Sequence, residues 1–438
     1  MRSARAAGKD EPLLPDRERP ERSGSGRRSL LVSVFNVVNT TFGTGFFLYP
    51  KALVANGVGI GLAAVCALLA LVVFSLHSLA DAVGRSPASL TAYPETIGYF
   101  SRPWCARVIS ASIQIYLVGA GAAYLALFSD QAAVLWGGPP PRWVLLLGPT
   151  VLAVPFSLLR SMSAFAFTSA FGVLVNCVVV AVLSHGAAAK LWRDGVAPQQ
   201  QCDGDDSAPS AGAAFATLCS TVVFSFQSHS DAFIPNLRSL DFPTAAARRA
   251  SASTVIHVSV LFCATIYVSF GVLGALAWGC DAGADPLSDN LEVGAVTQLA
   301  RALVCLKVLL SYPLLFFAAR LCLGHAVLSD DITKPQHAWL FHSYTPLFLL
   351  GSWALAAAVP KIDSLADLAA ALAGTLQVFV WPGLLWVALH YYRAYPYADE
   401  GAQAGGRGHP VHVLAGLLLA AAGLGVACCG VAAVLWTG

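Results

Sequence analysis

The chain has 438 residues, of which 57% are apolar and 11% are charged, and its mean hydropathy is +0.66. A soluble domain carries about 25% charged residues, so the composition excludes an ordinary soluble globular protein, a disordered chain and a nucleic-acid-binding protein. It predicts a polytopic membrane protein, in which the net charge of +2 matters less than the position of each charge along the chain.

The sequence contains eleven apolar runs that are each long enough to cross a bilayer as a helix. They cover residues 30–54, 57–79, 105–128, 143–160, 163–186, 213–235, 252–278, 295–319, 339–359, 366–391 and 410–436. We therefore expect an all-α membrane domain of eleven transmembrane helices over residues 29–437. A short turn around Arg160 is all that separates the fourth run from the fifth.

Positive residues mark the cytoplasmic side of a membrane protein. With eleven spans and the N-terminus inside, most of the 26 Lys and Arg residues fall in cytoplasmic segments. The opposite side holds only Lys51, Arg142, Lys190, Arg193 and Lys361. The sequence thus predicts a cytoplasmic N-terminus.

Residues 1–28 are rich in Arg, Ser, Gly and Pro, and we expect a disordered cytoplasmic tail. Within this tail Asp10, Leu13 and Leu14 have the spacing of an acidic dileucine signal for a trafficking adaptor. A pattern of five residues arises by chance about as often as by function, so both interpretations stay open.

The first run is interrupted in its middle by polar and small residues. Asn39 and Thr41 precede Gly43, Thr44 and Gly45, a stretch of poor helix propensity. The two glycines allow the helix to unwind and to expose backbone groups to a buried substrate. Close helix packing through small residues is the alternative, although packing does not explain the neighbouring asparagines.

The sixth run has a second interruption. Ser225, Ser228, His229, Ser230 and Asp231 all lie before Pro235, and an Asp and a His inside the membrane require a wet cavity or a partner. In the alternative, Asp231 lies near the cytoplasmic end and caps a helix. Interrupted first and sixth runs predict a five-plus-five inverted-repeat transporter fold, with its site at the midplane and one additional helix.

The eighth run contains Lys307 four residues before Ser311, so both side chains lie on one helix face. Lys307 lies deep in the run and is expected to point into the bundle, where its ammonium needs an anion or loses its proton. Arg301, nearer the start of the run, is expected to reach water. The polar residues Gln114, Asn176, His257 and Gln377 are expected to form interhelical hydrogen bonds.

Two cysteines lie in polar loops that the proposed topology places outside the cytoplasm. Cys202 follows the fifth run and Cys280 follows the seventh, so a disulfide between them is predicted. We expect neither a metal site nor an organic cofactor.

Several stretches together resemble the amino acid/auxin permease family of secondary transporters, from about residue 30 to residue 436. The segment from Asn39 to Gly45, with Pro50 and Gly57, looks like the first helix of that family, and Phe226 to Pro235 resembles its broken sixth helix. The stretch from Lys307 to Ala319 is similar to the eighth helix of vesicular inhibitory amino acid transporters and their vacuolar relatives. The resemblance departs at Gly43-Thr44-Gly45, at His229 and at Asp231.

The resemblance implies an amino acid transporter in the lipid bilayer. In sodium-coupled members, positions matching Asn39 and Ser311 contribute to ion binding. Because Lys307 lies one turn from Ser311, a fixed ammonium could replace a bound cation. Proton-coupled transport in a vesicular, lysosomal or vacuolar membrane is therefore the favoured interpretation, with sodium-coupled transport of neutral amino acids at the plasma membrane as the alternative.

The assigned roles follow from these patterns. Thr41, Gly43, Thr44 and Gly45 are expected to bind the substrate together with Ser225, Ser228, His229 and Ser230, and Asn39, Asp231, Lys307 and Ser311 to couple the ion. One rival is an amino acid sensor that binds without transport. The other, an intramembrane enzyme, lacks any zinc or nucleophile motif in the sequence, so we expect no enzymatic activity.

Overall fold

The computed structural model describes residues 25–87, 90, 92–138, 140–158, 166–198, 210–240, 244–328, 332, 334–359, 361–392 and 410–437. Within these ranges the secondary structure is entirely helical. The dileucine pattern with Asp10, Leu13 and Leu14 lies outside them. The first helix begins at Ser25, four residues before the predicted start of the membrane domain.

Each of the eleven apolar runs coincides with helix. The first five runs correspond to α1 (Ser25–Thr41) with η1 (Thr44–Leu48) and α2 (Tyr49–Asn56), α3 (Val58–Arg85), α5 (Pro103–Trp136), α6 (Arg142–Ser157) and α7 (Ala166–Asp194). A short helix, α4 (Tyr93–Phe100), lies between α3 and α5. The helices α6 and α7 are separate, while the turn around Arg160 lies outside the described residues.

The remaining six runs follow the same pattern. They correspond to α8 (Ala211–Ser225) with η4 (His229–Phe233) and α9 (Ile234–Ser239), α10 (Ala245–Trp278), α12 (Ala295–Leu328), α13 (Ala338–Ala358), a run from α14 (Ile362–Ala369) through η7 (Ala370–Gly374), η8 (Leu376–Val380) and α15 (Trp381–Val387) to η9 (Ala388–Tyr392), and α16 (Pro410–Thr437). Three short elements, η5 (Gly279–Asp281), α11 (Pro286–Asp289) and η6 (Pro335–His337), lie in the connections.

Seven of these helices are long and apolar enough to cross a membrane, and the bent pair of α1 with η1 and α2 makes an eighth. The shorter apolar helices α6 and α8, with 16 and 15 residues, do not reach that length alone. The protein is therefore an all-helical polytopic membrane protein. The count of eleven crossings stays a prediction.

The helix ends follow local chemistry. The side chains of Ser210 and Thr244 accept hydrogen bonds from the backbone at the first turns of α8 and α10, at 3.3 and 3.1 Å. Gly57 and Gly137 end α2 and α5 with positive φ angles of 72° and 69°, which favour glycine.

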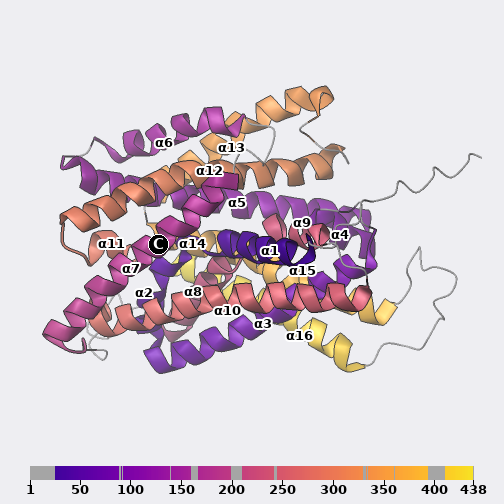
Figure 1. Cartoon of the computed structure of the whole chain (residues 1–438), viewed down its shortest axis with the longest axis horizontal. Coiled ribbons are helices and arrows are strands. Elements are labelled where there is room, and N and C mark those ends of the chain that lie inside the picture. Colours follow the sequence, from indigo (N-terminus) through magenta and orange to yellow (C-terminus); the bar gives the residue numbers. More distant parts are fainter. Residues whose placement is uncertain are drawn as a thin grey trace, which may run out of the picture.

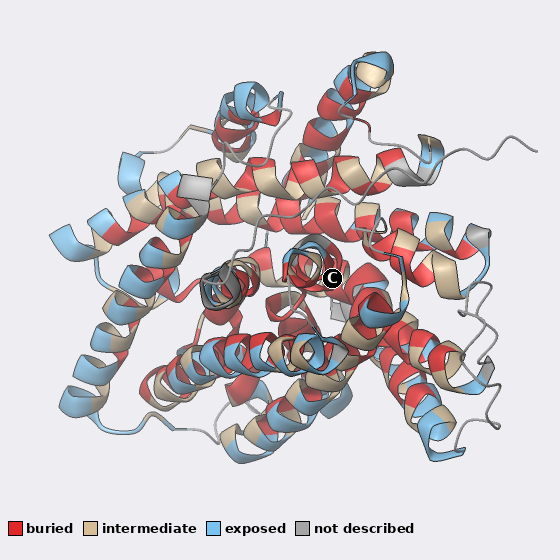
Figure 2. Ribbon diagram, turned by 45° about the vertical axis from the view of Figure 1, so that its right-hand side comes forward, coloured by how far each residue is buried: buried red, intermediate tan, exposed pale blue. Residues whose placement is uncertain are grey.

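The long helices lie side by side along the longest axis of the molecule (Figure 1). Helix α5 packs against α12, α13 and α14, while α10 packs against α1, α3 and α7. Buried residues gather in the middle of the bundle and exposed residues on its outer helix faces (Figure 2). Large apolar side chains such as Leu347 and Leu350 are 70% and 58% exposed, as expected of a surface that contacts lipid rather than water.

Candidate functional site

The first helix break lies between α1 and η1. Gly43 is extended, with φ −91° and ψ −154°, and the chain continues at 45° to α1. Because the helix stops, carbonyl groups at its end lose their helical partners. The Tyr267 hydroxyl of α10 donates to the Thr41 carbonyl at 2.7 Å, and the Asn176 amide of α7 donates to the Phe42 carbonyl. The break thus occurs where the sequence predicts it, and neighbouring helices hold it open.

The second break lies between α8 and η4. Gln227 spans it, because its side-chain oxygen accepts from the backbone N–H of His229 at 3.0 Å while its side-chain nitrogen donates to Ser230 at 3.0 Å. The same nitrogen donates to the Gln377 side-chain oxygen. Most polar groups in this break therefore form hydrogen bonds within the sixth run or with Gln377 of the tenth run.

The ring of His229 is fully buried and faces α3 rather than the first run. Its Nε2 lies 2.7 Å from Ser75 Oγ, and that hydroxyl donates to the Val72 carbonyl at 2.8 Å. The His229 Nε2 is accordingly the donor to Ser75. The other ring nitrogen, Nδ1, is buried and has no hydrogen-bond partner among the residues that the structure describes.

The two breaks meet in the middle of the bundle. A Cβ at Gly45 would lie 2.2 Å from Ser225 Oγ, so only glycine permits this approach of η1 to α8. On one side of the contact α2 packs on α8, and on the other α1 packs on η4 and α9. Asn36 of α1 donates to Asn236 of α9 at 2.9 Å. The two interrupted helices therefore run antiparallel, with their breaks side by side.

The predicted ion-coupling residues Asn39 and Ser311 converge on α7. Asn39 Oδ1 and Ser311 Oγ each lie 3.8 Å from the point where a Cβ at Gly172 would be. Helices α1 and α12 thus each present a side-chain oxygen to the same position on α7. Oxygen ligands are what a hard cation prefers.

Lys307 points into the bundle, as predicted. Its side chain is only 4% exposed, and among the described residues its Nζ has no hydrogen-bond partner. The Nζ lies 5.8 Å from the ring centroid of Tyr124, and the Tyr124 hydroxyl is 3.7 Å from the Cβ position at Gly43. Through Tyr124, the amine of α12 therefore lies close to the first helix break.

A known protein family and several known proteins match most of this chain. Residues 26–399 match the family described as transmembrane amino acid transporter protein. The chain belongs to this family. It is 26% identical over 390 residues to the sodium-coupled neutral amino acid transporter 7 of Xenopus laevis, covering 83% of this chain and 82% of that protein. It is also 22% identical over 400 residues to solute carrier family 38 member 8 of Homo sapiens, covering 85% and 87%.

The resemblance to the amino acid/auxin permeases is thereby confirmed for this member of the transmembrane amino acid transporter family. The named relatives are sodium-coupled neutral amino acid transporters and a solute carrier of family 38, whereas the eighth helix suggests the vesicular branch. Their function as transporters is consistent with a chain that is not an enzyme.

Two predicted site features in this transporter lie beyond what the structure describes. The backbone of Asp231 lies in η4, but its side chain is not described. Cys202 lies outside the described residues, so its disulfide with Cys280 stays a prediction. The other nine cysteines, all in the described part of the chain, are free thiols.

The roles of Tyr124 and Tyr267 are not evident from the sequence, because a tyrosine in an apolar run gives no signal of its partner. Interhelical hydrogen bonds were predicted for the polar residues in the runs. Asn176 forms one, Gln114 donates to the Ala319 carbonyl at 2.7 Å, and Gln377 donates to the Ser112 carbonyl at 3.2 Å. The prediction is wrong for His257, which bonds within its own helix to the Ser253 carbonyl at 2.8 Å.

Proposed function

We propose that this protein is a secondary active transporter that moves amino acids across a membrane by alternating access. The meeting of two interrupted helices at Gly45 and Ser225 inside the bundle carries this proposal. Interrupted helices offer unpaired backbone groups to a zwitterionic substrate, and their glycines serve as hinges when one half of the protein moves against the other.

The substrate site in this proposal extends from Thr41 through Gly43 and Thr44 to Gly45. The Thr44 hydroxyl supports it, because this group is buried without a partner among the described residues and can bind a ligand. The amides and carbonyls of this segment would bind the carboxylate and the amine. The sixth run would contribute Ser225, Ser228 and Ser230, but not His229, whose ring bonds to Ser75 of α3. The names of the relatives point to neutral amino acids as the substrate class.

Lys307 is the residue that we propose for proton coupling. A buried ammonium without an anion costs several kcal/mol, so its charge should depend on whether a substrate carboxylate lies beside it. A proton bound together with the carboxylate would then cross with the substrate. Asp231 or His229 would take up or release the proton during the alternation.

Sodium coupling is the second candidate, and two observations favour it. Asn39 and Ser311 approach a common point beside Gly172, and the relative at 26% identity is named as sodium-coupled. In this alternative the cation binds between α1 and α12, and its charge takes the place of the proton on Lys307. The two candidates therefore differ in which cation, a proton on Lys307 or a sodium ion between α1 and α12, accompanies the substrate.

Uptake of radiolabelled amino acids into proteoliposomes distinguishes them, under an imposed proton gradient, a sodium gradient or neither. We expect proton-driven uptake that Lys307→Ala reduces to the level of empty vesicles. Lys307→Arg, which keeps a permanent charge, should also abolish proton coupling. Lys361→Ala removes an exposed lysine outside the bundle and should transport like the wild type.

The remaining outcomes select among the alternatives. Uptake that requires sodium, is indifferent to Lys307 and is lost in Ser311→Ala would replace proton coupling by sodium coupling. Saturable binding without flux under any gradient would contradict transport and favour an amino acid sensor.

Orientation and location belong to the same proposal. The distribution of Lys and Arg supports a cytoplasmic N-terminus. A vesicular, lysosomal or vacuolar membrane suits a proton-driven transporter, and the plasma membrane suits a sodium-driven one. A trafficking adaptor at Asp10, Leu13 and Leu14 would direct the protein to its membrane.

A further inference from the structure

A cavity of about 800 Å³ lies away from the two helix breaks, at one end of the bundle. Its walls come from the last turns of α3, the end of α9, the first turns of α10, and α15 with η9. Its volume is in the range of sites that bind small molecules. Neither the transport site nor the coupling residues contribute to its lining.

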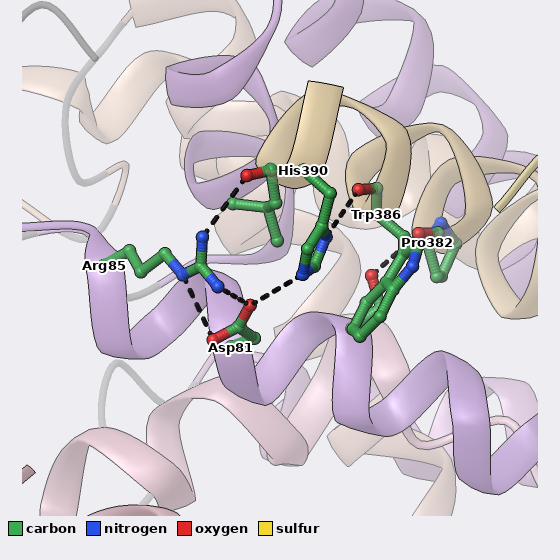
Figure 3. A network of polar contacts seen from close by, with 7 residues as sticks. Asp81, Arg85, Pro382, Trp386 and His390 are labelled. Carbon is green, nitrogen blue, oxygen red and sulfur yellow. Dashed lines mark hydrogen bonds and ion pairs between the residues drawn. The ribbon is translucent and has the colours of Figure 1, made fainter. Parts of the chain in front are cut away.

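The acidic group of this cavity is already neutralised. Asp81 forms an ion pair with Arg85 at 2.5 Å, and Arg85 also donates to the Leu389 carbonyl at 3.2 Å. Figure 3 shows Asp81 between Arg85 and His390, whose Nε2 lies 4.0 Å from the carboxylate. His390 Nδ1 donates to the Trp386 carbonyl at 2.9 Å. The carboxylate of Asp81 is therefore used within the protein.

Two positive charges of the cavity have no counter-charge in the part of the chain that the structure describes. Arg248 and Arg249, at the start of α10, are exposed, and neither has an ion pair or hydrogen bond among the described residues. Burial and then the charge of Arg248 lower the pKa of the nearby Arg238 guanidinium. In the described lining, one carboxylate thus stands against three guanidinium groups, an excess of positive charge that an anion would compensate.

The cavity also has an apolar wall. Leu237 of α9 and Leu240, directly after α9, line it with Val83 of α3, and Trp386 closes it on the side of α15. A soluble phosphate needs only the arginines, whereas a lipid needs an apolar surface beside its charged headgroup. Basic pockets between transmembrane helices on the cytoplasmic side bind such headgroups.

We propose that this cavity binds the phosphorylated headgroup of an anionic membrane lipid, with Arg248 and Arg249 on the phosphate and Trp386 beside the start of the acyl chains. Under the proposed orientation the cavity lies on the cytoplasmic side, where anionic lipids are enriched. A lipid bound here would join α3 and α10 to the tenth run.

Native mass spectrometry of the full chain, titrated with phosphatidylinositol 4,5-bisphosphate, tests the proposal. We expect Arg248→Gln/Arg249→Gln to weaken lipid binding about 30-fold, because the double substitution removes two arginines that attract an anionic headgroup near the membrane surface. The matched control Arg102→Gln/Arg107→Gln removes two exposed arginines from the same side of the bundle, outside the cavity, and should bind like the wild type. Ser253→Trp fills the cavity without changing its charge and should also lose binding.

Three results would overturn the proposal. One is equal weakening in both arginine pairs, which would show attraction to general positive charge. Another is unchanged binding in the cavity pair and in Ser253→Trp, with all variants melting like the wild type. The third is binding of inositol 1,4,5-trisphosphate as tight as that of the lipid, which would assign the cavity to a soluble phosphate compound.

Discussion

Two basic side chains of α12 are buried by different parts of the protein. Lys307 lies near the first helix break, beside Tyr124, without a hydrogen-bond partner among the described residues, whereas Arg301 donates to the Leu287 carbonyl of α11 at 2.6 Å. Arg301 was expected to reach water. This expectation is wrong, because Arg301 is fully buried. The connection that contains α11 covers it, which the sequence of α12 does not reveal.

The same connection contains an unusual carboxyl group, Asp285. Burial raises its pKa to about 7, with a further contribution from the charges of Asp130 and Asp289. The pKa of an aspartate in an unfolded chain is about 3.9. Between these values the folded protein binds the additional proton, so the stability that this group contributes is present at low pH and lost as pH rises through about 7.

We therefore predict that the wild-type protein melts at a higher temperature at pH 5 than at pH 8, and that Asp285→Asn reduces this difference because it stays neutral. Thermal unfolding in detergent across this pH range measures the effect. The control Asp281→Asn, at an exposed position, should keep the wild-type difference. An Asp285→Asn protein with an undiminished pH difference would show that this carboxyl is not responsible.

Within the first helix break, the two glycines Gly43 and Gly45 differ in how closely neighbouring atoms approach them, a difference that the sequence does not show. A Cβ at Gly43 would make ordinary contacts, at 3.7 Å from the Tyr124 hydroxyl. A Cβ at Gly45 would lie 2.9 Å from Ser225 Cβ and 3.0 Å from its Cα. Gly43 has a φ of −91°, which any residue can adopt, so we infer that glycine is used here to leave space for the proposed substrate.

Gly45→Ala should therefore destabilise the protein by about 2 kcal/mol, because η1 and α8 must separate, while Gly43→Ala should fold normally and lose uptake. Thermal unfolding and proteoliposome uptake of both variants measure this. Ser225→Gly should partly restore the stability of Gly45→Ala, because it removes the clashing Oγ and Cβ. Similar melting of the two alanine variants would contradict the close contact at Gly45.

At the scale of the whole molecule, the number of crossings decides where the termini lie. Eleven spans place the two ends on opposite sides of the membrane, whereas the eight spans that length and hydropathy alone support would place them on the same side. The orientation also decides which membrane face the lipid cavity occupies. A topology measurement therefore tests both proposals at once.

We predict that a glycosylation acceptor on a spacer after the C-terminus is modified in cells, and that one before the N-terminus is not. Gel mobility before and after deglycosylation measures this, with Gln in place of the acceptor Asn as the control. Modification of both ends, or of neither, would rule out an odd number of spans. Modification at the N-terminus alone would invert the orientation.

The helical membrane fold, the family and the two helix breaks can all be predicted from the amino-acid sequence. A long apolar run in lipid must form its backbone hydrogen bonds internally, which favours a helix. Glycine and polar residues inside such a run are energetically unfavourable, so their presence indicates a helix break or a functional site. The position of Lys307 inside the bundle followed from its depth in the eighth run.

The partners of these groups were decided only by the tertiary structure. His229 was expected beside the substrate but turns to Ser75, and Arg301 lies under α11 rather than in water. Tyr267 and Asn176 hold the first break from helices that are distant in sequence. The lipid cavity likewise combines α3, α9, α10 and α15. Periodicity determines which face of a helix is buried, whereas the neighbour on that face depends on how all the helices pack.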